Sequence, residues 1–144
     1  MKTIMLLFVL LSSNQQCNQS GQLKLLKATS QSWSGGAAAT RGVYYNIYLG
    51  MALNADYIFD SLWVDGKRLP IGIKPAKATD TLTLLANDRM GVRMPGTDID
   101  PSKSVEANSP VATDAEGVLG YFYKGNRKYL AIPTFQKLKP LAYP

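Results

Sequence analysis

The chain has 144 residues, of which 46% are apolar and 18% are charged, and its formal net charge is +6. This length suits one domain with a single hydrophobic core, and this composition is typical of a globular chain and not of a disordered one. The chain has no histidine, which excludes serine–histidine–aspartate catalysis, the commonest general base and most zinc sites. We therefore expect a protein that is not an enzyme and that uses no catalytic residue, cofactor or metal.

Residues 1–16 have the pattern of an export signal. Lys2 precedes an apolar run over residues 4–11, and a polar segment follows at residues 12–16. A positive start before a short apolar core is typical of a signal peptide, whereas a membrane-spanning helix needs about 20 apolar residues. We predict a signal peptide over residues 1–16 and a protein that leaves the cytoplasm. A buried core helix is the alternative.

Cys17 is the only cysteine, so no intramolecular disulfide can form. Its position just beyond the apolar run predicts the lipid-modified cysteine of a bacterial lipoprotein, although Asn14 and Gln16 replace the aliphatic and small residues usual there. The alternative is a cut near Ser12 that leaves a free thiol. Residues 17–22 are small or polar and predict a flexible tether. We expect a membrane partner through this anchor and a location in the cell envelope, periplasmic or at the outer membrane, or otherwise secretion.

Residues 23–53 predict two strands. The β-forming end of residues 23–33 favours a strand over a helix, and Gly35 and Gly36 end it. The second strand, residues 42–53, alternates with a period of two, which places one set of side chains against a core. That set is Val43, Tyr45, Ile47 and Leu49, and the half-polar opposite set is Tyr44, Asn46 and Tyr48.

Residues 57–74 carry the clearest fold signal, a β-hairpin. A β-forming run ends at Asp65 and Gly66, which tolerate the positive φ angles of a type I′ turn, and residues 67–74 return with Pro70 marking an edge or a bulge. Both faces of the first strand are apolar, as expected of a central strand or of one that presents aromatic rings to a partner. The period of two places Tyr57, Phe59 and Trp63 on one face and Ile58, Leu62 and Val64 on the other.

Residues 79–86 alternate and predict another strand. Residues 87–116 show little periodicity, so they form a functional loop or conceal a short strand near residues 104–107. Residues 117–134 predict a second hairpin that turns at Gly125 and Asn126, and residues 135–144 end the chain as a tail or a last short strand.

About seven strands joined by hairpins, with no predicted helix, indicate an all-β protein. We predict an antiparallel β-sandwich of immunoglobulin-like type, with a small barrel as the alternative. The expected organisation is one domain over residues 23–144, behind the signal peptide and the tether.

Asp60 is the acidic residue whose context merits comparison with a catalytic carboxylate, because two carboxylates suffice to hydrolyse a glycoside. The alternative role for Asp60 is a hydrogen-bond acceptor at a bulge, since a buried carboxylate needs partners in either case. Calcium also prefers oxygen ligands, but the other acids do not follow EF-hand spacing, and solvated turns explain them. These acids are Asp88, Asp98, Asp100, Asp114 and Glu116.

The last hairpin interleaves cations with aromatic residues, as in a groove for single-stranded nucleic acid. Cations on an edge strand that prevent pairing with other chains give the same pattern, and export argues against a nucleic-acid partner. We expect no nucleic acid. The residues are Tyr121, Phe122, Tyr123, Lys124, Arg127, Lys128 and Tyr129.

Four aromatic residues are the candidate ligand-binding residues: Tyr44, Tyr48, Tyr57 and Trp63. Flat rings beside the polar Asn46 suit stacking on sugar rings or contact with a protein chain. Core packing is the alternative, because tryptophan and tyrosine are often largely buried.

Three segments resemble small uncharacterised exported lipoproteins of Bacteroidetes: Ser-Trp-Ser-Gly-Gly at 32–36, Phe-Asp-Ser-Leu-Trp-Val-Asp-Gly-Lys-Arg-Leu-Pro at 59–70, and Lys-Tyr-Leu-Ala-Ile-Pro at 128–133. The resemblance implies an envelope location and no particular activity. We expect an exported, lipid-anchored binding or accessory module with a protein or a glycan as its partner. The alternatives are a carbohydrate-binding module with an aromatic face and a small hydrolase that depends on carboxylates.

Overall fold

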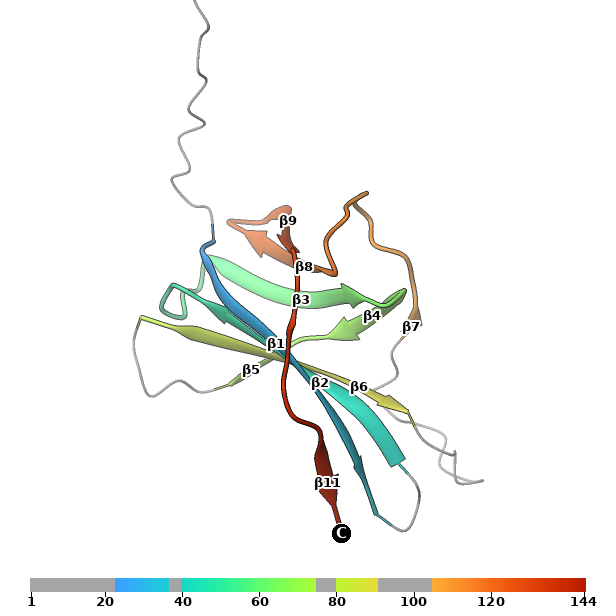
Figure 1. Ribbon diagram of the computed structural model, residues 1–144. Coiled ribbons are helices and arrows are strands. Elements are labelled where there is room, and N and C mark those ends of the chain that lie inside the picture. Colours follow the sequence, from blue (N-terminus) through green and yellow to red (C-terminus); the bar gives the residue numbers. More distant parts are fainter. Residues whose placement is uncertain (1–22, 37–39, 75–79, 91–104) are drawn as a thin grey trace, which may run out of the picture.

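The computed structural model describes residues 23–36, 40–74, 80–90 and 105–144, and within them the chain forms strands and no helix (Figure 1). No helix in this part of the chain could therefore cross a bilayer. The predicted signal peptide, residues 1–16, and the tether, residues 17–22 with Cys17, lie outside the described residues. The all-β prediction is confirmed. The strands are β1 (Leu25–Gly35), β2 (Thr40–Leu49), β3 (Tyr57–Val64), β4 (Lys67–Pro70), β5 (Gly72–Lys74), β6 (Leu82–Met90), β7 (Val105–Glu106), β8 (Gly117–Tyr123), β9 (Asn126–Ile132), β10 (Gln136–Lys137) and β11 (Leu141–Tyr143).

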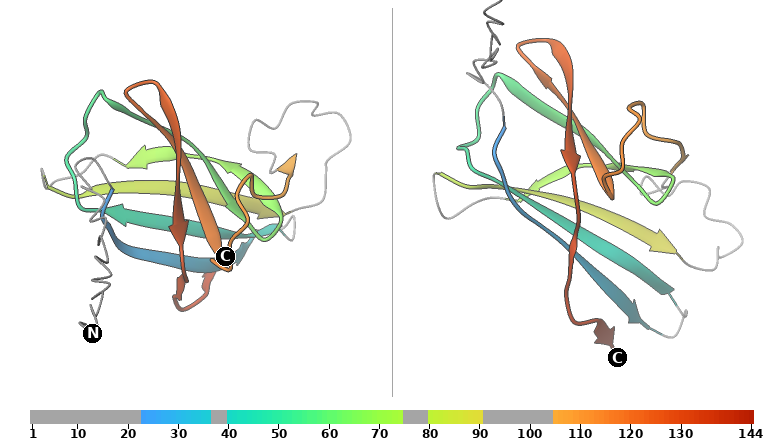
Figure 2. Two further views of the ribbon diagram at one scale, coloured as in Figure 1. Left: turned by 90° about the horizontal axis from the view of Figure 1, so that it is seen from above. Right: turned by 45° about the horizontal axis from the view of Figure 1, so that its top comes forward.

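The strands form two sheets that pack face to face as a β-sandwich (Figures 1 and 2). Sheet A has the order β10-β1-β2-β6-β5, with β11 also paired to β1, and sheet B has the order β7-β4-β3-β8-β9. The pairings are antiparallel, apart from the parallel pairing of β10 and β11 with β1. The predicted antiparallel β-sandwich is therefore confirmed.

One apolar core fills the space between the sheets. In β2 the predicted alternation is confirmed, because Tyr45, Ile47 and Leu49 are buried and Val43 packs against them. The largest fully buried apolar side chains come from both sheets, and they are Ile47, Leu49, Leu62, Leu69, Leu84, Leu119 and Ile132. Burial of these side chains supplies the main stabilisation of the sandwich.

The alternation of β3 reverses partway along the strand. The pairing of β3 with β8 shifts between Phe59 and Ser61, so Asp60 occupies a bulge. Phe59 before the bulge and Leu62 after it both belong to the core, whereas Trp63 faces away from it. The prediction that Tyr57 and Trp63 share a face is therefore wrong, because one extra residue moves every later side chain to the other face.

The turns and short strands refine the predictions. Asp65 and Gly66 have φ angles of 51° and 70°, as predicted for the first hairpin. The second hairpin turns at Lys124 and Gly125, one residue earlier than predicted, with φ angles of 48° and 79°. Near residues 104–107 the alternative of a short strand is present as β7, and the tail, for which a last short strand was one possibility, contains β10 and β11.

Two connections cross from sheet B to sheet A. The return strand after the first hairpin divides at Ile71, so that β4 belongs to sheet B and β5 to sheet A. The second crossing follows β9, where Phe135 enters the core and contacts the ring of Tyr45 edge to face at 5.1 Å. The Phe135 backbone N–H donates to Oε2 of Glu116 at 2.7 Å, which fixes this crossing.

Polar contacts join the sheets at the end that carries the Asp65 turn. The Tyr45 hydroxyl donates to Oδ2 of Asp65 at 3.2 Å, and Nζ of Lys67 lies 2.7 Å from Oδ2 of Asp88. Asp88 is only 3% exposed, and its Oδ1 has no hydrogen-bond partner within the described residues. The sequence placed Asp88 in a loop, but β6 continues to Met90 and Asp88 lies on its inner face.

We predict that stability falls at alkaline pH because of Tyr45. Burial, the charge and hydrogen bond of Asp65, and the nearby carboxylates of Asp88 and Glu116 raise the pKa of Tyr45 above its ordinary value. The unfolded chain therefore loses this proton near pH 10 while the folded chain keeps it, and the free energy of unfolding falls by about 1.4 kcal/mol per pH unit above pH 10.

Urea unfolding of the wild type and of Tyr45→Phe as a function of pH tests this. In Tyr45→Phe the free energy of unfolding should fall less steeply with pH above pH 10 than in the wild type. Tyr48→Phe, on the outer face of the same strand, should keep the wild-type slope. Equal slopes for the wild type and Tyr45→Phe above pH 10 would contradict the assignment.

Candidate functional site

The outer face of sheet A carries a hollow lined by polar side chains from three adjacent strands. The register places Gln31 of β1, Tyr44 of β2 and Asn87 of β6 in one row across the sheet, and Asn46 and Leu85 in the next. These residues, with Pro70 and parts of Tyr45 and Ala86, line a volume of about 430 Å³. We call it the amide hollow, after Gln31, Asn46 and Asn87.

An aromatic wall stands at one side of the amide hollow. The rings of Trp33 and Tyr44 stack at a centroid distance of 5.6 Å with an interplanar angle of 23°. Nε1 of Trp33 donates to Oδ1 of Asn87 at 3.2 Å, which orients the amide. A Cβ at Gly42 would lie 2.7 Å from Nε1 of Trp33, so a glycine at this position leaves room for the indole.

The end of the chain completes this wall. β11 pairs with β1 beside Trp33, and burial together with a side-chain hydrogen bond to Tyr143 raises the pKa of Tyr44. Nε2 of Gln31 donates to the backbone oxygen of Lys139 at 2.8 Å. The C-terminal tail thus holds Tyr44 and Gln31 in position.

The amide hollow retains groups that can bind a ligand. Nδ2 of Asn46 lies 3.5 Å from Oγ1 of Thr29, at the limit of a hydrogen bond, and its Oδ1 has no protein partner among the described residues. In Asn87, Oδ1 accepts from Trp33, and Nδ2 likewise has no protein partner in this part of the chain. The hollow therefore offers at least one acceptor and one donor beside an aromatic ring.

The structure separates the four aromatic residues that the sequence grouped. Tyr44 lines the amide hollow, and Tyr48 lies on the same face of β2 but outside the hollow. Tyr57 packs against the core, with its ring 4.6 Å from that of Tyr123 and 6.1 Å from that of Phe59. Trp63 lies on the outer face of sheet B and is 8% exposed.

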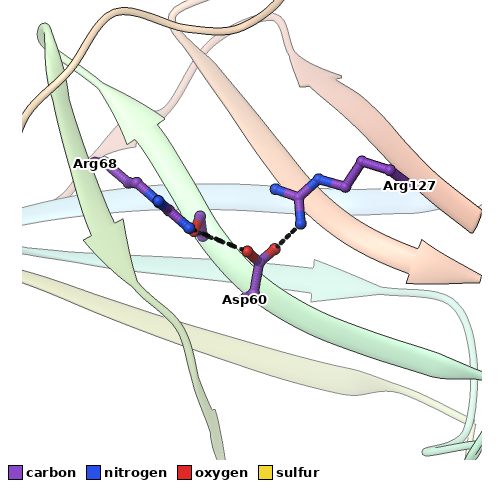
Figure 3. Close-up of polar contacts among 4 residues, drawn as sticks. Asp60, Arg68 and Arg127 are labelled. Atoms are coloured by element: carbon purple, nitrogen blue, oxygen red, sulfur yellow. Dashed lines mark hydrogen bonds and ion pairs between the residues drawn. The ribbon is translucent and has the colours of Figure 1, made fainter. Parts of the chain in front are cut away.

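On that outer face, Trp63 lies between two arginine side chains. The guanidinium carbons of Arg68 and Arg127 are 5.5 Å and 5.6 Å from its ring centroid, within the range of cation–π contacts. Asp60 holds both arginines, accepting from Arg127 at 2.8 Å and from Arg68 at 3.3 Å (Figure 3). The polar groups of this cluster therefore bind mainly one another.

Asp60 was compared above with a catalytic carboxylate and with a hydrogen-bond acceptor at a bulge, and its contacts are those of an acceptor. Asp60 occupies the bulge and accepts hydrogen bonds from Arg68, Arg127 and Ser61, as its alternative role predicted. Of the other acids, Glu116 accepts from Phe135, Asp114 is exposed, and Asp98 and Asp100 lie outside the described residues. In the ranges that the structure describes, no three acidic or cysteine side chains come together to hold a metal ion.

Sequence reasoning named Tyr44 and Asn46 but missed Trp33, Gln31 and Asn87 as parts of one site. Trp33 and Gln31 are two residues apart on β1, which places them on one face. Asn87 was assigned to a loop, although extending the alternation of Thr83 and Leu85 by two residues would have placed it on that face too.

We predict that Gly120→Ala disturbs the arginine–tryptophan cluster. A Cβ at Gly120 would lie 2.6 Å from the Trp63 ring and 2.6 Å from Nη2 of Arg127, so both side chains must move. Such overpacking lowers the free energy of unfolding by about 1–3 kcal/mol. Urea unfolding and a red shift of the tryptophan emission measure the change. The exposed Gly72→Ala, with only a 3.9 Å contact, serves as the control, and equal stability of the two variants would contradict the close packing.

Comparison of the chain with protein-family models, with curated proteins and with solved structures finds no match. What the protein binds is therefore inferred from its own residues. Among its described surfaces, the amide hollow with its aromatic wall is the candidate functional site.

Proposed function

We propose that the protein is an exported binding module, held at a bacterial cell envelope by a lipid on Cys17, that recognises a carbohydrate in the amide hollow. The observation that carries the carbohydrate is the combination of Tyr44 with Asn46 and Asn87 in one hollow. A sugar presents hydroxyl groups around its ring and apolar C–H groups on its faces. Amides satisfy the hydroxyls in both directions, and an aromatic ring contacts the apolar face.

The dimensions of the hollow support this ligand. A volume of about 430 Å³ lies within the range of about 300–1,000 Å³ that small-molecule sites occupy. The site is built on the central strands β1, β2 and β6, whose pairing fixes the side chains before a ligand arrives. Because the amide hollow contains no charged side chain, it suits a neutral sugar better than an ion.

The location rests on the leader. The apolar run at residues 4–11, Cys17 after it and the resemblance to exported lipoproteins together support an envelope protein. A binding module at that location meets polysaccharides outside the cytoplasm.

A glycan array followed by isothermal titration calorimetry tests the carbohydrate. We expect Tyr44→Ala to lower the affinity for a bound glycan about tenfold. The lost stacking is worth ~1 kcal/mol, and the Tyr44 hydroxyl, which can form hydrogen bonds, is removed together with the ring. Asn46→Ala is the second variant, since its long contact with Thr29 contributes little to folding and its loss leaves the sandwich intact.

Tyr48→Ala is the matched control, because Tyr48 lies on the same strand and face but outside the amide hollow. Its affinity should equal that of the wild type. The absence of glycan binding, or equal losses for the Tyr44 and Tyr48 variants, would count against the carbohydrate site.

Membrane fractionation of cells tests the anchor. We expect a high-salt wash, which screens any attraction between lysines and acidic headgroups, to leave the wild type in the membrane fraction and to release Cys17→Ala into the soluble fraction, because without the thiol there is no atom to acylate. Ser20→Ala changes the same tether and should leave the partitioning unaltered. Unchanged partitioning of Cys17→Ala would remove the lipid from the proposal.

A further inference from the structure

One end of the sandwich gathers three segments that are distant in sequence. In the first view of Figure 2 the start of β1 and the loop of residues 50–56 lie on the left, and the turn between β8 and β9 lies at the upper left. The Gly50 N–H donates to Lys24 O at 2.8 Å, and the Lys124 N–H donates to Asp56 O at 2.9 Å. We call this the tether end, because the tether of residues 17–22 joins the described chain here at Leu23.

The tether end exposes three large aliphatic side chains. Leu53 is 64% exposed, Ile58 is 61% exposed and Leu26 is 48% exposed. Leu53 precedes a turn that hydrogen bonds hold in place. Oδ1 of Asn54 accepts from the Asp56 N–H at 2.9 Å, and the backbone oxygen of Asn54 accepts from the Tyr57 N–H at 3.1 Å. These are the three most exposed aliphatic side chains among the described residues, and none of them belongs to the hydrophobic core.

Several lysines lie at or near this end of the strands. The strand register places Lys24, Lys27, Lys74, Lys124 and Lys128 at or within a few residues of this end, against the acids Asp56 and Asp80. None of these lysines forms an ion pair within the described residues. The tether end therefore combines exposed aliphatic groups with an excess of positive charge, which is the combination that an anionic lipid surface attracts.

We propose that the tether end docks onto an anionic lipid bilayer. Leu53, Ile58 and Leu26 enter the interfacial region, and the lysines meet the acidic headgroups. The position of the tether favours a bilayer as the occupant, because the six residues from Cys17 to Leu23 span at most about 20 Å when fully extended. An anchored Cys17 keeps this end within that distance of the membrane. The nearness of the tether end to the membrane therefore rests on the proposed anchor, whereas the attraction to lipid rests on the aliphatic side chains and the lysines.

The docking also explains a difference between the two ends of β3. At the far end, Asp65 accepts a hydrogen bond from Tyr45, and Asp88 of β6 pairs with Lys67. At the near end, Ile58 and the loop of residues 50–56 present aliphatic groups to the outside. The most exposed aliphatic side chains lie at the near end, so this is the end that meets the lipid surface.

The single cysteine makes a direct test practical. In a full-length Cys17→Ala background, Leu53→Cys places one thiol at the tether end for an environment-sensitive fluorophore, and Val111→Cys places one near the far end. Val111 is the matched control, because it is an exposed aliphatic residue on a loop that lies beside the Asp65 turn. The probes are vesicles of phosphatidylcholine alone and of phosphatidylcholine with phosphatidylglycerol.

We expect the fluorophore at position 53 to shift to the blue on the phosphatidylglycerol vesicles, and the one at position 111 to keep its emission in water. Replacing Lys24 and Lys124 by Gln should weaken the partition about fivefold for each lysine. Circular dichroism checks that each variant remains folded. Equal shifts at positions 53 and 111, or equal binding to both kinds of vesicle, would overturn the proposal.

The vesicle measurement can be interpreted whatever the results of the fractionation and of the glycan array. Because Cys17 is replaced, a protein that carries no lipid in cells would give the same vesicle result. Because the amide hollow lies on the face of sheet A and not at its end, the labelled chains retain glycan binding, and a negative glycan array leaves the vesicle measurement unaffected.

Discussion

The bulge at Asp60 decides how sheet B meets the core. Without the extra residue, Leu62 and Val64 would point away from sheet A and Trp63 would point into it. The bulge turns the second half of β3 over, and the carboxylate of Asp60 remains outside, where Arg68 and Arg127 bind it. The reversed strand then fits two apolar side chains into the core, and the bulky indole lies over Gly120 on the outer face.

The two outer faces of the sandwich have different chemistry. On sheet B, the charges of Arg68, Arg127 and Asp60 compensate one another, and the Trp63 ring lies between the two guanidinium groups. On sheet A, the amide hollow is lined by uncharged side chains, and the amides of Asn46 and Asn87 keep hydrogen-bonding groups available beside Tyr44. Polar groups that pair with one another, as on sheet B, stabilise the fold. Polar groups that are held in place without a protein partner, as in the amide hollow, are suited to bind a ligand.

The two proposed contacts use separate parts of the molecule. The amide hollow lies on the broad face of sheet A, whereas Leu53 and its neighbours lie at the end of the strands. A module that rests on a bilayer by its end leaves its broad face accessible from the side. Membrane attachment and glycan recognition are therefore compatible in one molecule, with no movement of the sheets.

The all-β class, the hairpin at Asp65 and Gly66, and the inward set of β2 could be predicted from the amino-acid sequence, because they depend on the period of two and on turn chemistry. The same period identified Tyr44 and Asn46 as neighbours on one face. The positions of Trp63, away from the face of Tyr57, and of Trp33, Gln31 and Asn87, beside Tyr44, follow from the folded sheets. A bulge has no reliable local signature, and side chains on strands far apart in the sequence meet only when the register of the sheet brings them into one row.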